Sequence, residues 1–121
     1  MKQAVAVLGA SSKPGRYSYK AVEALLEAGH TVFPVHPSGR EVNGLRCYPS
    51  LCDIEEPLDT ITVYVSEKNS EALIGEILDV GPRRVILNPG AESEALRTQC
   101  ESAGIRVEEA CTLVLVTTGQ F

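Results

Sequence analysis

The chain has 121 residues, the length of one domain, and 44% of them are hydrophobic, as in an ordinary globular protein. Its net charge of -5 argues against broad binding of nucleic acids or acidic membranes, because both require a basic face. We therefore expect one domain over residues 1–121 that binds neither nucleic acid nor membrane. A local cluster of cations could still hold a small anion.

The sequence also lacks targeting and metal signals. The first apolar run is too short for a signal peptide, and no run approaches the roughly 20 apolar residues of a membrane helix. These observations predict a cytoplasmic protein. There is no Cys-x-x-Cys pair and no histidine at metal-ligand spacing from a cysteine, so we expect reduced thiols and no metal site. The cysteines are Cys47, Cys52, Cys100 and Cys111.

Strand-like and helix-like patterns alternate along the chain. Strands are predicted at residues 3–8, 31–35, 59–65, 85–87 and 105–107. Helices are predicted at residues 16–28, from Ser66 or Asn69 to about Val80, and at residues 92–103, and residues 111–116 form a final short helix or strand. Pro34 indicates either an edge strand or the end of a strand, because proline has no amide hydrogen to donate. The alternation predicts an α/β fold with a single doubly wound, mostly parallel five-stranded sheet and helices on both faces.

The loop after the first strand carries a binding signal. Gly9 follows an apolar strand and permits a sharp turn, and serine hydroxyls come after it. The next helix begins near Arg16, so its unpaired amides and this guanidinium face the same space. The loop therefore predicts a site for a phosphate or diphosphate. The dinucleotide fingerprint Gly-x-Gly-x-x-Gly is incomplete here, which leaves an ordinary strand-to-helix turn as the alternative.

Four loops are expected to meet at one edge of the sheet. In a doubly wound fold, ligands bind at the carboxyl ends of the strands, where the winding direction reverses. The loops that reach this edge are residues 9–18, 36–40, 65–69 and 88–91, and all carry small or polar residues. Their convergence is a stronger signal than any one motif.

Several stretches of the chain together resemble a known family. They are Gly9-Ala10-Ser11-Ser12, Arg16-Tyr17-Ser18-Tyr19, Pro34-Val35-His36-Pro37 and Gly44-Leu45-Arg46-Cys47-Tyr48-Pro49-Ser50-Leu51. In these stretches the chain resembles the small stand-alone CoA-binding proteins, which are similar to the CoA-binding domain of succinyl-CoA synthetase. The resemblance implies a Rossmann-like domain that holds coenzyme A or an acyl-CoA along the carboxyl edge of its sheet.

The resemblance also implies a role for each loop. Around the diphosphate it places Gly9, Ala10, Ser11, Ser12, Arg16, Tyr17 and Ser18. Toward the adenosine end it places Val35, His36, Pro37, Ser38 and Arg40, with Val65 and Ser66 beside the adenine or ribose. Along the pantetheine path it places Asn88, Pro89 and Gly90.

The sequence contains no recognisable set of catalytic residues. There is no Gly-x-Ser-x-Gly motif, no carboxylate pair in a binding loop and no metal set. The leading hypothesis is therefore non-catalytic binding of CoA or an acyl-CoA by a sensor or carrier subunit, with a second copy or a partner subunit completing the site. Two alternatives stay open: an NADP-dependent oxidoreductase or redox regulator, and an interaction subunit without a ligand. NAD is disfavoured because no acid follows the second strand, whereas Ser38 and Arg40 suit a ribose phosphate of NADP or CoA.

A few other residues have competing interpretations. His36 either contacts adenine or is a partly exposed loop histidine. Cys111 either lies near the ligand, where a mixed disulfide with CoA is conceivable, or is a small buried apolar residue, which we favour. Cys47 has no evident role. Arg83 and Arg84 are expected to be a solvated pair at the opposite edge of the sheet.

Overall fold

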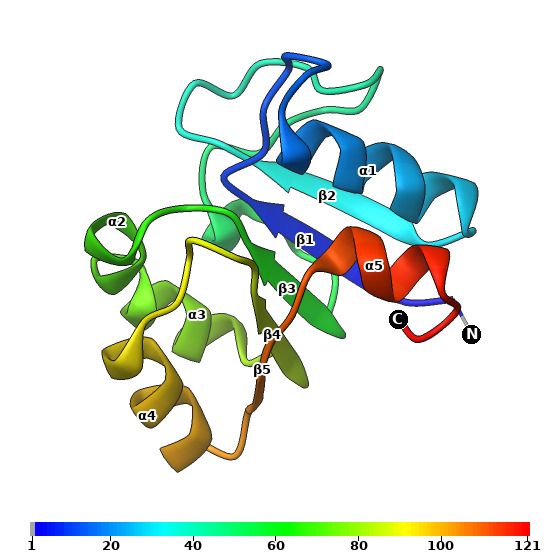
Figure 1. Ribbon diagram of the computed structural model, residues 1–121. Helices are drawn as coiled ribbons and strands as arrows, with labels where there is room; N and C mark the ends of the chain where they lie inside the picture. Colours follow the sequence, from blue (N-terminus) through cyan, green and yellow to red (C-terminus); the bar gives the residue numbers. More distant parts are fainter. Residues whose placement is uncertain (1) are drawn as a thin grey trace.

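The computed structural model describes residues 2–121 and contains one sheet of five parallel strands (Figure 1). The strands are β1 (Ala4–Leu8), β2 (Thr31–Val35), β3 (Thr60–Val63), β4 (Arg84–Leu87) and β5 (Arg106–Glu109). Their order across the sheet is β2-β1-β3-β4-β5. This arrangement confirms the predicted doubly wound α/β fold, and the winding reverses between β1 and β3.

Helices cover both faces of the sheet (Figure 1). The helices are α1 (Tyr17–Glu27), η1 (Leu51–Asp53), α2 (Glu67–Glu71), α3 (Ile74–Val80), α4 (Glu94–Ser102) and α5 (Thr112–Thr117). In Figure 1, α1 and α5 lie on one face, and α3 and α4 lie on the other. No helix in residues 2–121 is both long and apolar enough to cross a membrane.

The alternation of side chains along the strands explains these two layers. Val5 and Val7 point to the face of α1 and pack with its buried Leu25. Ala6 and Leu8 point the other way, into a larger core with α3 and α4. Successive strand residues face opposite sides of a sheet, so an unbroken apolar strand such as β1 must be covered on both.

The edge position of β2 is confirmed, and it shapes the neighbouring segment. Pro34 contributes no amide hydrogen, but its carbonyl accepts a hydrogen bond from the Tyr48 amide at 2.8 Å. The His36 amide in turn donates to the Tyr48 carbonyl at 2.9 Å. These two bonds fold the chain after β2 back over its carboxyl end.

Most predicted boundaries are within about two residues of the observed ones, and two differences change the region around the site. The helix expected to run to Val80 is split into α2 and α3. The Ser70 hydroxyl bonds the Glu67 carbonyl, and the Leu73 amide bonds the Ser70 carbonyl, so a tighter turn replaces the α-helical ladder. The third strand ends at Val63 rather than Val65, which leaves Tyr64 in a loop.

Arg84 corrects the prediction of a solvated arginine pair. The Arg83 side chain is 88% exposed, but Arg84 is only 6% exposed as a residue. Its Nε donates to Thr60 Oγ1 at 3.1 Å, and its Nη1 lies 3.3 Å from Glu108 Oε2. Because Arg84 is the first residue of β4, strand pairing aligns it with Thr60 of β3 and brings it beside these partners.

Candidate ligand-binding site

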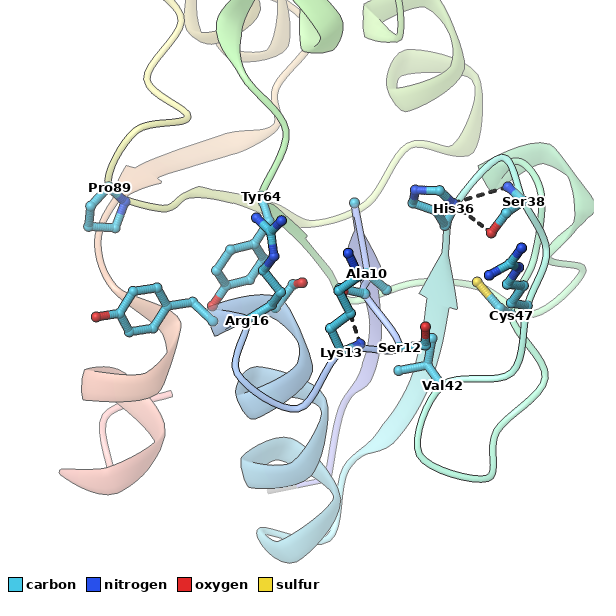
Figure 2. A pocket seen from close by; sticks show the side chains of 15 residues that line it. Ala10, Ser12, Lys13, Arg16, His36, Ser38, Val42, Cys47, Tyr64 and Pro89 are labelled. Carbon is cyan, nitrogen blue, oxygen red and sulfur yellow. Dashed lines mark hydrogen bonds between the residues drawn. The ribbon is translucent and has the colours of Figure 1, made fainter.

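A pocket of about 660 Å³ opens at the carboxyl edge of the sheet (Figure 2). Its lining residues are Gly9, Ala10, Ser11, Ser12, Lys13, Arg16, Tyr17, Ser18, His36, Ser38, Arg40, Val42, Cys47, Tyr64 and Pro89. All the residues predicted in the first loop are among them, together with His36, Ser38, Arg40 and Pro89. The structure thus brings most of the predicted binding residues into one cavity, at the point where the winding reverses.

Gly9 allows the first loop to leave β1 in close contact with β3. Its φ is +89°, and a Cβ at this position would lie 2.7 Å from Val65 Cγ1. The amides of Gly9 and Ala10 both donate to the Val35 carbonyl, at 3.0 and 3.1 Å. This glycine therefore serves the close approach of two backbones, and its own amide is already bonded.

Other donors of the first loop are available to a ligand. Within residues 2–121, the amides of Ser11 and Ser12 have no backbone acceptor. The Ser11 hydroxyl accepts a hydrogen bond from the Lys13 amide at 3.1 Å and holds the loop in shape. The first turn of α1 follows directly, and the first amides of a helix have no partner within it. The loop and the helix start thus present several donors to the pocket.

The charge of the pocket is opposite to that of the whole chain. Lys13, Arg16 and Arg40 line it, and no aspartate or glutamate does. Among residues 2–121, none of these three cations forms an ion pair. The chain contains 16 acidic residues and has a net charge of -5, so a pocket without a carboxylate is a strong local exception. Such a site favours a ligand with several negative charges.

His36 is held in a fixed orientation at one end of the pocket (Figure 2). Its Nδ1 accepts a hydrogen bond from the Ser38 amide at 3.0 Å and lies 2.8 Å from the Ser38 hydroxyl oxygen. Because Nδ1 accepts, the proton of the neutral ring is on Nε2. The exposed face of this loop histidine can therefore offer a donor or a flat stacking surface.

Four lining residues were not predicted: Lys13, Val42, Cys47 and Tyr64. Val42 and Cys47 reach the pocket only because the chain folds back after β2. Cys47 is 3% exposed, and burial raises the pKa of its thiol, although a hydrogen bond with the His36 backbone partly opposes this shift. A signal for Lys13 was present in the sequence, because it lies between Ser12 and Arg16 in the predicted anion loop.

A second pocket, of about 390 Å³, adjoins the first. The two pockets share Gly9 and His36. The lining of the second pocket is mostly apolar, with four polar side chains from His36, Ser50, Asn69 and Glu76. The predicted residues Val35, Pro37 and Val65 are found here. The site is therefore divided into a cationic part and an apolar part.

Three predicted residues, Ser66, Asn88 and Gly90, line neither pocket. Asn88 is 2% exposed, and its side chain is fully used within the fold. Its Nδ2 donates to Thr62 Oγ1 and to the Val63 carbonyl, at 2.7 and 2.8 Å. Its Oδ1 accepts from the Thr112 amide at 2.9 Å. Asn88 therefore joins β3, β4 and α5 beneath the site.

Cys111 lies just before α5 and is partly buried. It does not line either pocket. The position is near the carboxyl edge of the sheet, as expected, but outside the two cavities that a ligand would occupy.

The family to which the chain belongs follows from comparison with known proteins. A family model described as "CoA binding domain" matches residues 3–117. The chain belongs to this family. The match covers nearly the whole of this CoA-binding domain, including both pockets.

Relatives and a solved structure show what the chain is similar to. The domain is 35% identical over 71 residues to the protein YneT of Bacillus subtilis, a match that covers 59% of this chain and 50% of that protein. It is 30% identical over 63 residues to an ADP-forming acetate–CoA ligase of Methanocaldococcus jannaschii, covering 52% of this chain and 9% of the ligase. A solved structure from Thermus thermophilus superposes with a TM-score of 0.89 at 31% identity, covering 98% of this chain and 90% of that one.

Proposed function

We propose that this domain binds coenzyme A or an acyl-CoA without transforming it. The observation that carries the proposal is the pocket lined by Lys13, Arg16 and Arg40 with no carboxylate. Coenzyme A carries a diphosphate and a ribose phosphate, so it requires cations at more than one place. Guanidinium groups are well suited to phosphate oxygens, and each such charge-assisted hydrogen bond is stronger than a neutral one.

The two adjoining pockets fit the two kinds of surface that coenzyme A presents. The cationic pocket accommodates phosphates near Arg16 and the first loop. The apolar pocket, which begins at His36 and continues past Val65, accommodates the adenine ring. A flat apolar base between valine and proline side chains, with a phosphate on the other side of the glycine turn, is typical of nucleotide sites in doubly wound folds.

The end of β2 favours a ribose that carries a phosphate. A site for NAD has an aspartate or glutamate there to bind the ribose hydroxyls. This chain instead places Ser38 and Arg40 in the loop, and both line the cationic pocket. NADP would satisfy the same two residues. The family assignment makes CoA the leading ligand, and a binding experiment separates the two.

A partner is part of the proposal. The match spans 50% of YneT and 9% of the Methanocaldococcus jannaschii ligase, and the ligase therefore carries further segments beyond a region like this one. The pocket is open to solvent in this chain, and exposed Tyr17 lies at its wall. A second copy or a partner subunit would then cover the ligand, consistent with a sensor or carrier role.

The first test is calorimetric titration with coenzyme A, acetyl-CoA, NADP and NAD, supported by thermal shifts. A ligand present at about 100 times its dissociation constant stabilises the fold by about 2.7 kcal/mol, which gives a clear rise in melting temperature. Saturable binding of CoA compounds is expected. Binding of NADP alone would overturn the proposal, and binding of none of them would favour a ligand-free interaction subunit.

A matched pair of variants tests the position of the site. Arg16→Ala removes a cation from the pocket and is expected to weaken CoA binding about tenfold or more, since charge-assisted bonds contribute about 1.5–3 kcal/mol. Arg83→Ala removes the same side chain at the opposite edge, where it is 88% exposed, and should leave the affinity unchanged. Equal effects of the two substitutions would show that binding depends on net charge and not on this pocket.

A further inference from the structure

Tyr64 carries a buried hydroxyl group that no residue in the described chain satisfies. It follows the last residue of β3, and its side chain lines the cationic pocket (Figure 2). The phenolic oxygen is shielded from water and has no hydrogen-bond partner in residues 2–121. Buried polar atoms are nearly always hydrogen-bonded, so an exception at the wall of a binding pocket calls for a partner from outside the chain.

The neighbours of Tyr64 explain why its hydroxyl has no internal partner. Thr112 is the nearest candidate, and a side-chain interaction with its hydroxyl slightly lowers the pKa of Tyr64, but that hydroxyl lies 2.6 Å from Thr62 Oγ1 and makes its hydrogen bond there. Thr62 Oγ1 also accepts a hydrogen bond from Asn88 at 2.7 Å. These polar groups satisfy one another, and the phenol beside Thr112 makes no full hydrogen bond with any of them.

The position of Tyr64 indicates which part of a ligand would reach it. In Figure 2, Tyr64, Arg16 and Pro89 lie toward one end of the pocket, His36 and Ser38 lie at the other, and Ala10 and Lys13 of the first loop lie between. If the phosphates occupy the middle and the adenosine the His36 end, the remaining arm extends over Tyr64. That arm of coenzyme A is pantetheine, a neutral chain with two amide groups.

We infer that the Tyr64 hydroxyl forms a hydrogen bond with an amide of the pantetheine arm and thereby distinguishes CoA from nucleotides without that arm. This inference rests on the proposed function. An amide offers a carbonyl acceptor and an N–H donor, and a phenol can serve either. The bond would satisfy a group that is unsatisfied in the free protein, so its formation would favour the bound state.

The ionisation of Tyr64 is consistent with this role. Burial raises its pKa to about 12, with a smaller opposing effect from Thr112 and a raising effect from Cys111. The group therefore keeps its proton at neutral pH and can donate. A deprotonated phenolate would repel the phosphates in the same pocket, whereas the neutral phenol does not.

Two exposed side chains share the pocket with Tyr64. Tyr17 and Arg16 line the same pocket, and both are exposed, Tyr17 by 70%. Apart from a contact with the Lys20 ammonium at 5.5 Å, Tyr17 has little to hold it in place. Movement of these side chains therefore sacrifices little packing, so they can adjust to a ligand that binds over Tyr64.

The test compares CoA with adenosine 3′,5′-bisphosphate, which lacks the pantetheine arm, on the wild type and on Tyr64→Phe. The variant should bind CoA about threefold to tenfold more weakly, the worth of one net hydrogen bond, and should bind the bisphosphate unchanged. Its melting temperature without ligand should stay equal or rise, because an unsatisfied buried hydroxyl is removed. Tyr48→Phe deletes the same atom from a tyrosine outside both pockets and serves as the control.

The outcomes separate this inference from the proposed function. Wild-type protein that binds no CoA would overturn both. Wild-type protein that binds CoA with an affinity unchanged in Tyr64→Phe would overturn only the role of Tyr64. An equal loss of affinity for CoA and for the bisphosphate, or a fall in the melting temperature of the free variant, would show that the hydroxyl is structural and would also overturn it.

Discussion

The two ends of the sheet use arginine in opposite ways. At the amino end, Arg84 is buried, with its Nη2 donating to the Phe121 carbonyl at 3.2 Å and its guanidinium 4.6 Å from the centre of the Phe121 ring. At the carboxyl end, Arg16 and Arg40 are exposed and have no acidic partner within residues 2–121. Arg84 is thus neutralised within the fold, whereas Arg16 and Arg40 are not.

This difference separates groups that stabilise the fold from groups that are available to a ligand. A buried cation must be paired or hydrogen-bonded, because its desolvation is costly. An exposed cation has no such requirement and keeps its capacity to bind for another molecule. The comparison therefore predicts that the same Arg→Ala substitution affects stability at one end and ligand affinity at the other.

The largest effect is expected for Arg84→Ala. The change removes the donors that serve Thr60, Glu108 and Gln3 and leaves a buried gap at the start of β4. We expect the free energy of unfolding to fall by about 2–4 kcal/mol, measured by urea denaturation. Arg83→Ala is the control, and its weak ion pair with Asp59 at 3.9 Å should contribute less than about 0.5 kcal/mol. Similar losses in the two variants would contradict the contrast between a buried and an exposed arginine.

Gly9→Ala should have the next largest effect, and it acts at the carboxyl end through the backbone. The residue has a φ of +89°, and an added Cβ would lie 2.7 Å from Val65 Cγ1. Strain and displacement of Val65 should together cost about 2 kcal/mol of stability and also weaken CoA binding, because both pockets include Gly9. Gly15→Ala in the same loop meets no atom within 4 Å and should change neither quantity. A stable Gly9→Ala variant would mean that the loop has room to relax.

Regular patterns in the sequence predicted the fold and the first loop well. The apolar periodicity predicted the order of strands and helices along the chain, and Pro34 pointed to the edge position of β2. Both predictions depend on local chemistry. Val42 and Cys47 were missed as pocket residues, since they reach the site through bonds between Tyr48 and the end of β2, which no local pattern specifies. Arg84 was misjudged for a related reason: its burial depends on the register that aligns it with Thr60.

Ionisation of Tyr64 should have an intermediate effect on the free energy of unfolding. It tests the buried, uncharged phenol at the carboxyl end of the sheet. Its pKa is raised to about 12, whereas an unfolded tyrosine titrates near 10. The folded state therefore retains a proton that the unfolded state loses, so this contribution to stability is complete below about pH 10 and is lost as pH rises toward 12. Wild type should lose more stability than Tyr64→Phe across this alkaline range. Tyrosinate absorbance would locate the late titration, and equal losses in the two proteins would show that the buried phenol is not shifted.

The smallest effect on stability is expected for Arg16→Ala, even though this variant should show a large loss of ligand affinity. Arg16 precedes α1 and makes no side-chain hydrogen bond there, so its removal should change the free energy of unfolding by less than about 0.5 kcal/mol. Loss of one positive charge near Lys13 could even stabilise the ligand-free fold slightly, and added salt should reduce that gain by screening the repulsion. Urea denaturation at low and high ionic strength measures both quantities. If Arg16→Ala lowered the free energy of unfolding as much as Arg84→Ala, Arg16 would have a partner within the fold. The contrast between an arginine that is paired internally and one that is available to a ligand would then be wrong.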